Sequence, residues 1–180
     1  MTSKPRVIHF VTGGGSGATK VALELACGHL RTGNCEPLLV LRRKQVPLPA
    51  PMQAQITATG FRTAWVANGW KRTILRQLAA IIAEFQPQVF AAHGNSEHLW
   101  GRQAAFAASV PVVLHVELNC ERYPFWRRWA AQRLAARTTA TVCVSRGVAD
   151  HVRHLGLAGP RLDGFGVCEA GEQAEKGGCC

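Results

Sequence analysis

The sequence predicts an α/β fold built on a parallel sheet with helices on both faces. Short apolar runs alternate with helical patterns about five times along the 180 residues. The apolar runs are mostly continuous, which is typical of strands that are covered on both faces. The first run, which ends at Thr12, leads into "GGGSG" and then into an apolar pattern with a period near 3.6, the arrangement of a strand, a tight turn and a helix.

The alternation defines each element in turn. We expect strands at 6–12, 36–43, 61–67, 88–94, 110–117 and 140–146. We expect helices at 17–33, 69–87, 95–109, 124–137 and 147–157. Gly33 and Pro87 end two of these helices, Asn95 or Ser96 caps the third, and Pro124 opens the fourth. Segment 44–55 holds three prolines within five residues and is predicted to be a loop.

Length, composition and charge limit the possible classes. The chain is long enough for one domain with a real core, and its apolar content of 47% excludes a disordered chain. No run of 18 apolar residues spans a membrane, and the N-terminus reads as a strand rather than a signal peptide. Residues 1–162 carry 20 Lys and Arg against seven Asp and Glu, which favours anionic partners.

The cysteines and histidines predict no metal site. The seven cysteines form no C-x-x-C pair and their number is odd, which fits a reduced, cytoplasmic protein. His151 and His154 lie one helical turn apart and could share a metal, but no third ligand is evident, so a solvated helix face is the favoured interpretation. We therefore expect neither a metal nor a cofactor.

The glycine turn is compatible with several kinds of phosphate, because glycine exposes backbone amides and the following helix adds its positive end. A nucleoside triphosphate loop is excluded, because its second glycine and its magnesium-binding hydroxyl are both missing. The dinucleotide fingerprint matches at Gly13, Gly15 and Ala18, and "TGGGSGAT" resembles the turn of short-chain dehydrogenases. An NADPH-dependent reductase of that family is one alternative, although Tyr123 has Arg127 where that family has its lysine.

Three longer segments carry a second resemblance. "VTGGGSGATKVALELACGHL", "QPQVFAAHGNSEHLWGRQAAFAASVPVVLHVE" and "ATVCVSRGVADHV" occur in the order and spacing of family-4 glycosyltransferases. Residues 6–162 resemble the N-terminal, acceptor-side half of such an enzyme, which implies a Rossmann-like single lobe of a GT-B fold. The implied function is transfer of a sugar from a nucleotide-sugar substrate to a lipid-linked or polysaccharide acceptor, for example in lipopolysaccharide synthesis.

The resemblance also implies site residues. Those for phosphate or substrate are Gly13, Gly14, Gly15, Ser16, Gly17, Gly94, Asn95, Ser145 and Arg146. His93, His115 and Glu117 are catalytic candidates at strand ends. The chain departs from the family at Ala91 and at the His115–Glu117 pair, which stand where the family has histidine and Thr-x-His. A structural role for both histidines remains an alternative.

The helix expected at 124–137 combines tryptophan with arginine. Its candidates for membrane contact are Trp126, Arg127, Arg128, Trp129 and Arg133. Tryptophan and arginine together suit the headgroup boundary of an anionic membrane. The alternative is that the tryptophans pack on the sheet and the arginines are solvated. A basic membrane- or anion-binding module without catalysis is the third function class, and nucleic acid is not expected.

The family's second lobe has no counterpart in the chain. Residues 163–180 carry one lysine against four acids, and Glu169 and Glu175 lie six apart rather than eight. We interpret this segment as an irregular tail, either non-native or disordered, and residues 1–162 as the domain. The alternative is a short protein with its own native tail. The expectation is that the isolated chain is inactive, or active only with a separate C-terminal GT-B half, because half a cleft cannot orient donor against acceptor.

Overall fold

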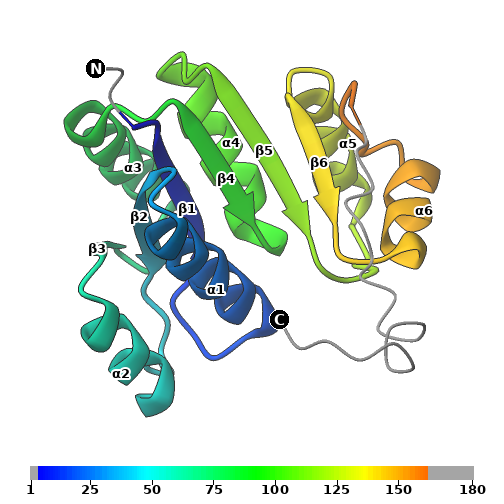
Figure 1. Ribbon diagram of the computed structural model, residues 1–180. Helices are drawn as coiled ribbons and strands as arrows, with labels where there is room; N and C mark the ends of the chain where they lie inside the picture. The colour runs from blue at the N-terminus through cyan, green and yellow to red at the C-terminus, as the bar shows by residue number, and fades with distance from the viewer. Residues whose placement is uncertain (1–3, 162–180) are drawn as a thin grey trace.

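Six parallel strands form a single sheet with helices on both faces, as the sequence predicts (Figure 1). The structure is a computed structural model and describes residues 4–161. The strands are β1 Arg6–Thr12, β2 Glu36–Arg42, β3 Arg62–Val66, β4 Val89–His93, β5 Val112–Glu117 and β6 Ala140–Cys143. The helices are α1 Gly17–Thr32, α2 Ala50–Thr59, α3 Lys71–Phe85, α4 Asn95–Ala107, α5 Phe125–Ala135 and α6 Arg146–His154.

The strand order, β3-β2-β1-β4-β5-β6, reverses direction between β1 and β4. β1 pairs with both neighbours, so that His9 lies opposite Leu39 on β2 and Ala91 on β4. Right-handed crossovers place the helices of the two halves on opposite faces. The α1 and α2 helices therefore lie on one face, and α3, α4 and α5 lie on the other (Figure 1). The reversal creates a crevice at the carboxyl ends of β1 and β4.

The two faces of the sheet have separate cores. On the α3–α4 face, Phe10 and Phe90 pack against Ile74, Leu78 and neighbouring residues, and all four of these side chains are fully buried. The α1–α2 face has its own core, made of α1 alanines and Leu23 packed on Leu39 and Leu41. A third cluster joins α4, α5 and α6 to the end of β6.

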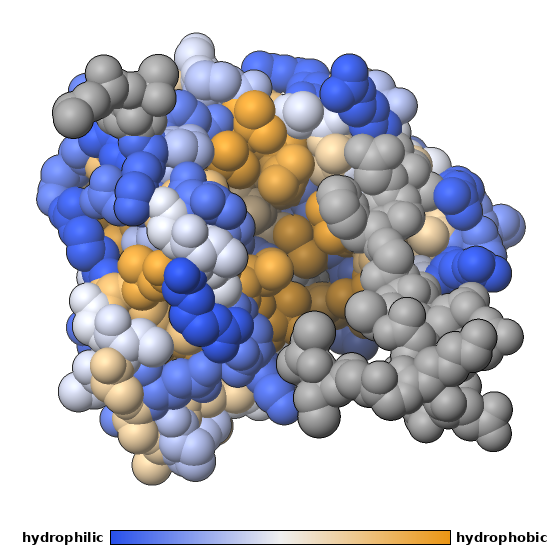
Figure 2. Space-filling model, viewed as in Figure 1, coloured by the Kyte–Doolittle hydropathy of each residue, from blue (hydrophilic) through white to orange (hydrophobic). Residues whose placement is uncertain are grey.

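The α1–α2 face is covered over only half of its width by the described residues. The part that we call the open half of the sheet consists of the side chains on that face of β4, β5 and β6 that are not fully buried, together with Val144, which directly follows β6: Val89, Val112, Leu114, Ala140, Val142 and Val144. The first five are partly exposed, and Val144 is 45% exposed. Figure 2 shows apolar side chains in a hollow beside α1. This opening follows from the topology, because the crossovers after β4 and β5 both run on the other face.

The prediction of a loop at 44–55 is wrong in its second half, where α2 begins at Ala50. The prolines do not oppose this helix, because Pro49 precedes it and Pro51 lies in its first turn, where a missing amide costs no hydrogen bond. The cap of α4 is Gly94, with φ of 74°, rather than Asn95 or Ser96. The interpretation of residues 163–180 as a tail, including Glu169 and Glu175, falls outside the described residues. Between residues 4 and 161, no helix combines the length and the apolar character that a bilayer crossing needs.

Candidate functional site

The glycine bend, residues 13–17, lies at the carboxyl end of β1, beside the point where the strand order reverses. Thr19 holds it in shape from the first turn of α1. The Thr19 hydroxyl donates to the Gly14 carbonyl at 2.6 Å and lies 3.0 Å from the Thr12 carbonyl. The Ser16 hydroxyl in turn accepts from the Thr19 amide at 3.2 Å and caps the helix. Thr19 is a functional residue that the sequence analysis did not identify, because its role depends on the fold of the bend.

The glycines of the bend serve two different purposes. A side chain on Gly13 would lie 2.6 Å from the Arg42 carbonyl, and one on Gly15 would lie 2.5 Å from the ring of Pro49. These two glycines are needed for packing within the chain. Gly14 has only Lys44 and Thr12 atoms at 3.6 Å or more, and Gly17 has no neighbour within 4 Å. Gly14 and Gly17 therefore leave space beside their backbone that another molecule can use.

A cavity of about 370 Å³ opens on the bend. Its lining residues are Thr12, Gly14, Gly15, Ser16, Lys44, Gln45, Val46 and Asn68. Among the described residues, the amides of Gly14 and Gly15 donate to no other group. The first amides of α1 have no partner within the helix. Gly94, at the start of α4, lies near α1, since a Cβ added to it would be 3.7 Å from Ala18 Cβ. The N-cap of α1 and Lys44 line the same cavity, which favours an anion.

A buried ion pair fixes the loop after β2 to α4. Arg42 Nε lies 2.7 Å from Glu97 Oε1, and Lys44 Nζ lies 3.7 Å from the same oxygen. The Arg42 guanidinium also lies over the Trp100 ring at 4.9 Å. No local spacing rule links residues that are 55 apart in the chain, so sequence reasoning could not find this pair.

His93 is fully buried and does not reach the surface of the crevice. Its Nε2 lies 3.1 Å from His9 Nδ1, and its Nδ1 has no partner among the described residues. Burial, together with the charge that His115 would carry, lowers the pKa of His93 to about 3. The His93 ring is therefore neutral near pH 7.

His115 and Glu117 belong to a second buried network, on the α4 face. Tyr123 donates its hydroxyl hydrogen to Glu117 Oε2 at 2.9 Å and lies 3.0 Å from His98 Nε2. His115 stacks on His98 with ring centroids 4.3 Å apart, and Arg102 lies 2.8 Å from His98 Nδ1. Burial and the nearby Arg102 charge lower the pKa of His115. Burial raises the pKa of Glu117, but hydrogen bonds from His115 and Tyr123 outweigh it, and the net shift is downward.

Glu121 is a titratable group that the sequence analysis missed. It follows β5 and is partly buried, and its Oε2 has no partner among the described residues. Burial, with the charges of Glu117 and Glu97, raises its pKa to about 7. A carboxyl group with this pKa can both give and take a proton near neutral pH.

Asn95, Ser145 and Arg146 lie at the same edge of the sheet as the glycine bend. Asn95 is the first residue of α4, and Arg146 is the first residue of α6. Ser145 caps α6 by accepting from the Val148 amide at 3.2 Å. Since β4 and β5 lie between β1 and β6, Ser145 is about 14 Å across the sheet from the bend. The structure therefore brings Gly94 to the bend but not Ser145 or Arg146.

The tryptophans of α5 are at the surface. Phe125 is 85% exposed, Trp126 is 55% exposed and Trp129 is 56% exposed. The Arg127 guanidinium lies 5.1 Å from the Trp126 ring centroid, and that of Arg133 lies 3.7 Å from the Trp129 centroid. Arg128 is half-buried and donates to the Leu155 carbonyl at 3.2 Å. We call Phe125, Trp126, Trp129 and their arginines the α5 patch.

The geometry does not favour the reductase alternative. Of the two arginines at the end of β2 that would suit the 2′-phosphate of NADPH, Arg42 is buried against Glu97 and Trp100, and only Arg43 is exposed. Burial and the neighbouring Glu117 raise the pKa of Tyr123, whereas the tyrosine of a short-chain dehydrogenase needs a lowered one.

Across residues 4–161, no cluster of three metal-ligating side chains is present.

Comparison with known proteins places these features in a family. The model of Glycosyltransferase Family 4 matches residues 15–163. A search of curated protein sequences finds no significant match. Solved structures with the same fold include a UDP-N-acetylglucosamine 2-epimerase from Listeria monocytogenes, with a TM-score of 0.66 and 13% identity over 86% of this chain and 43% of that one.

Two glycosyltransferases are among the similar structures. They are MurG from Acinetobacter baumannii, with a TM-score of 0.59 and 12% identity over 80% of this chain and 42% of that one, and the lipopolysaccharide outer core galactosyltransferase WaaB, with a TM-score of 0.61 and 12% identity over 86% and 43%. The chain therefore spans less than half the length of the structures that it matches.

Proposed function

The chain belongs to glycosyltransferase family 4, and from this premise we propose that it forms the acceptor-side lobe of an enzyme that transfers a sugar from a nucleotide-sugar donor to a lipid-linked or polysaccharide acceptor. The observation that carries the proposal is the cavity on the glycine bend, where unpaired amides and Lys44 face the same space. Two of the similar structures contain UDP or UDP-N-acetylglucosamine, which supports a uridine nucleotide as donor.

In this proposal the donor diphosphate binds at Gly14 and Gly15, where backbone amides donate to its oxygens and Lys44 offsets its charge, with the Ser16 side chain lining the same cavity. The charge that develops on the leaving phosphate during transfer would be stabilised by the same groups. His93, His115 and Glu117 are buried, so we assign them to holding the strand ends in place rather than to touching the sugar.

The binding part of the proposal is tested with the Gly14→Ala variant. The added methyl group has room in the fold but projects into the space beside the exposed amides. We expect UDP and pyrophosphate to bind the wild-type chain and to bind Gly14→Ala at least about tenfold more weakly, as one lost charge-assisted hydrogen bond implies. Ligand-observed NMR or calorimetry measures both affinities.

The control is Gly28→Ala, in the middle of α1, where the added methyl group meets no atom within 4 Å. It should bind both ligands like the wild type. Equal affinity of Gly14→Ala and Gly28→Ala, or no binding of UDP by any variant, would refute a phosphate site at the bend.

Catalysis in this proposal needs a second lobe that faces the bend. The described strand ends line only one side of the site, and orientation of both substrates supplies much of an enzyme's rate. The pure chain should release no UDP from nucleotide sugars, and sugar transfer should appear only when a facing lobe is added. Steady turnover by the pure chain would contradict this part of the proposal alone.

We also propose that the α5 patch binds an anionic membrane surface, which would hold the lobe near a lipid-linked acceptor. The specific observation is that three large aromatic side chains on one helix are more than half exposed and adjoin arginines. Such side chains suit the interface between headgroups and acyl chains. A double variant, Trp126→Ser with Trp129→Ser, should lose co-flotation with phosphatidylglycerol vesicles.

The matched control for the membrane experiment is Trp70→Ser. Trp70 is 88% exposed but lies at the start of α3, away from the α5 patch. It should float like the wild type, and salt should weaken flotation of both proteins. Equal flotation with neutral and anionic vesicles, or equal losses in the two variants, would rule out this role.

A further inference from the structure

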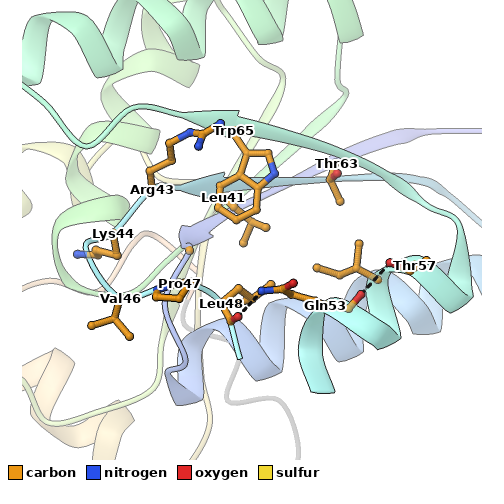
Figure 3. Close-up of a pocket in the computed structure, with 12 residues that line it drawn as sticks. Leu41, Arg43, Lys44, Val46, Pro47, Leu48, Gln53, Thr57, Thr63 and Trp65 are labelled. Carbon is orange, nitrogen blue, oxygen red and sulfur yellow. Dashed lines mark hydrogen bonds between the residues drawn. The ribbon is translucent and has the colours of Figure 1, made fainter. Parts of the chain in front are cut away.

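A second cavity, of about 380 Å³, lies between α2 and the edge of the sheet formed by β2 and β3 (Figure 3). Its lining residues are Gly13, Leu41, Arg43, Lys44, Val46, Pro47, Leu48, Gln53, Ile56, Thr57, Thr63 and Trp65. It adjoins the cavity on the glycine bend, because Lys44 and Val46 line both. The loop of residues 43–49 therefore separates two neighbouring sites.

The α2 helix leaves this cavity open because it is loosely packed. None of its residues is fully buried, and only Met52 and Ile56 pack against the core on this face. The helix carries no charged residue and has no apolar stripe. Figure 3 shows Gln53 and Thr57 on the helix side of the cavity, facing Leu41, Thr63 and Trp65 on the sheet side.

The walls combine an aromatic platform with polar groups. The Trp65 ring is 42% exposed, and an edge of it abuts Gly13, where an added Cβ would lie 2.8 Å from Trp65 Cζ3. Gln53, Thr57 and Thr63 lie around the apolar side chains of Leu41 and Ile56. The Gln53 amide donates to the Leu48 carbonyl and the Thr57 hydroxyl donates to the Gln53 carbonyl, so the oxygens of these two side chains are left to accept from a ligand. A sugar ring needs this mixture, because its C–H face packs on an aromatic ring while its hydroxyls exchange hydrogen bonds.

The charge at the mouth of the cavity has one sign. The Arg43 guanidinium lies over Trp65 at 5.6 Å from the ring centroid and has no acidic partner among the described residues. Lys44 is different, because its ammonium group lies 3.7 Å from Glu97. Within residues 4–161, no Asp or Glu lines the cavity. Arg43 is therefore the cation that is placed to meet an anionic group on a ligand whose ring lies on Trp65.

We propose that this cavity binds an acidic sugar residue of the acceptor, one that carries a carboxylate or a phosphate, with its ring on Trp65 and its anionic group at Arg43. Calling this sugar the acceptor rests on the proposed function. Its binding to the cavity can be tested without sugar transfer. It places the acceptor on one side of the 43–49 loop and the donor diphosphate on the other.

The experiment is ligand-observed NMR of the full chain with four probes: glucuronic acid, glucose 6-phosphate, glucose and inorganic phosphate. We expect the two acidic sugars to bind at least about tenfold more tightly than glucose, and phosphate alone to bind weakly. Arg43→Gln should remove the preference for acidic sugars, and Arg72→Gln, an exposed arginine on α3, should not. Glucose binding as tightly as glucuronic acid, or phosphate as tightly as glucose 6-phosphate, would overturn the proposal.

A variant that fills the cavity distinguishes loss of the binding site from loss of the fold. Thr57 is an exposed residue of α2 that lines the cavity, so Thr57→Trp should fold and should block sugar binding. Undiminished sugar binding by folded Thr57→Trp would also overturn the proposal. The two proposals can be refuted separately. Loss of UDP binding in Gly14→Ala tests the bend, whereas loss of sugar binding in Thr57→Trp tests this cavity.

Discussion

Individual residues at the glycine bend divide into those that the fold requires and those that leave space for a ligand. Gly13 donates its amide hydrogen to the Arg42 carbonyl at 2.7 Å, so β1 and the end of β2 approach closely at this point. Any side chain there would meet both that carbonyl and the ring of Trp65. Gly14, the next residue, has no such neighbour. Adjacent glycines in one motif thus differ in whether stability or binding depends on them.

Gly13→Ala should destabilise the protein by about 1–3 kcal/mol, because the backbone carbonyl that it meets cannot move aside as a flexible side chain could. Gly14→Ala should change stability by much less. Urea denaturation followed by circular dichroism measures both free energies of unfolding. Equal stability of the two variants would show that the bend is not packed as described.

Four buried histidines make stability depend on pH. Burial lowers the pKa of His9, His93, His98 and His115 below the ordinary value of 6.5. Below pH 6.5 these histidines bind protons in the unfolded chain but not in the folded chain. The free energy of unfolding therefore falls as the pH falls. Each histidine contributes up to about 1.4 kcal/mol per pH unit in that range and nothing above it.

Urea denaturation between pH 7.5 and 4.5 measures this dependence. Stability should be nearly constant above pH 7 and should decline steeply below 6.5. His93→Gln should reduce the slope by about one proton. A flat profile down to pH 5 would contradict the burial of these rings.

At the scale of elements, the sequence predicts nearly every helix and strand, because apolar periodicity and strand–helix alternation are local signals. The exception is α2, whose prolines read as a loop and whose residues show no periodic stripe. For the candidate site, the sequence predicts only the residues that lie at the ends of the strands. The Arg42–Glu97 pair and the network around Tyr123 depend on which side chains meet across faces of the sheet, and no local pattern carries that information.

Two helix glycines should respond in opposite ways to the same change. Gly28→Ala in α1 should stabilise the protein by about 0.5–1 kcal/mol, because the methyl group has open space and alanine favours the helix. Gly101→Ala in α4 should destabilise it, since its Cβ would lie 2.8 Å from Phe10 and 2.9 Å from Phe90. Thermal unfolding of the two variants measures both effects. A gain from both changes would mean that α4 does not lie as close to the sheet as described.

At the scale of the molecule, the two proposed sites lie at one edge of the sheet, on either side of one loop. Residues 1–162 carry 20 Lys and Arg against seven Asp and Glu, so an anionic donor, an acidic acceptor and an anionic membrane would all be attracted. The fold class and the family follow from the sequence alone, because topology and motif order are properties of the whole chain. In our proposal the acceptor is selected by a few side chains, such as Trp65 and Arg43, that belong to no sequence motif.

The open half of the sheet has a practical consequence for handling the protein. This half exposes an apolar surface, made by Val144, Leu114 and Val142, that parallel sheets normally bury. Purified at high concentration, the lobe should bind fluorescent hydrophobic dyes and scatter light through self-association. Substituting charged residues on this surface, beginning with Val144→Lys, should reduce the self-association.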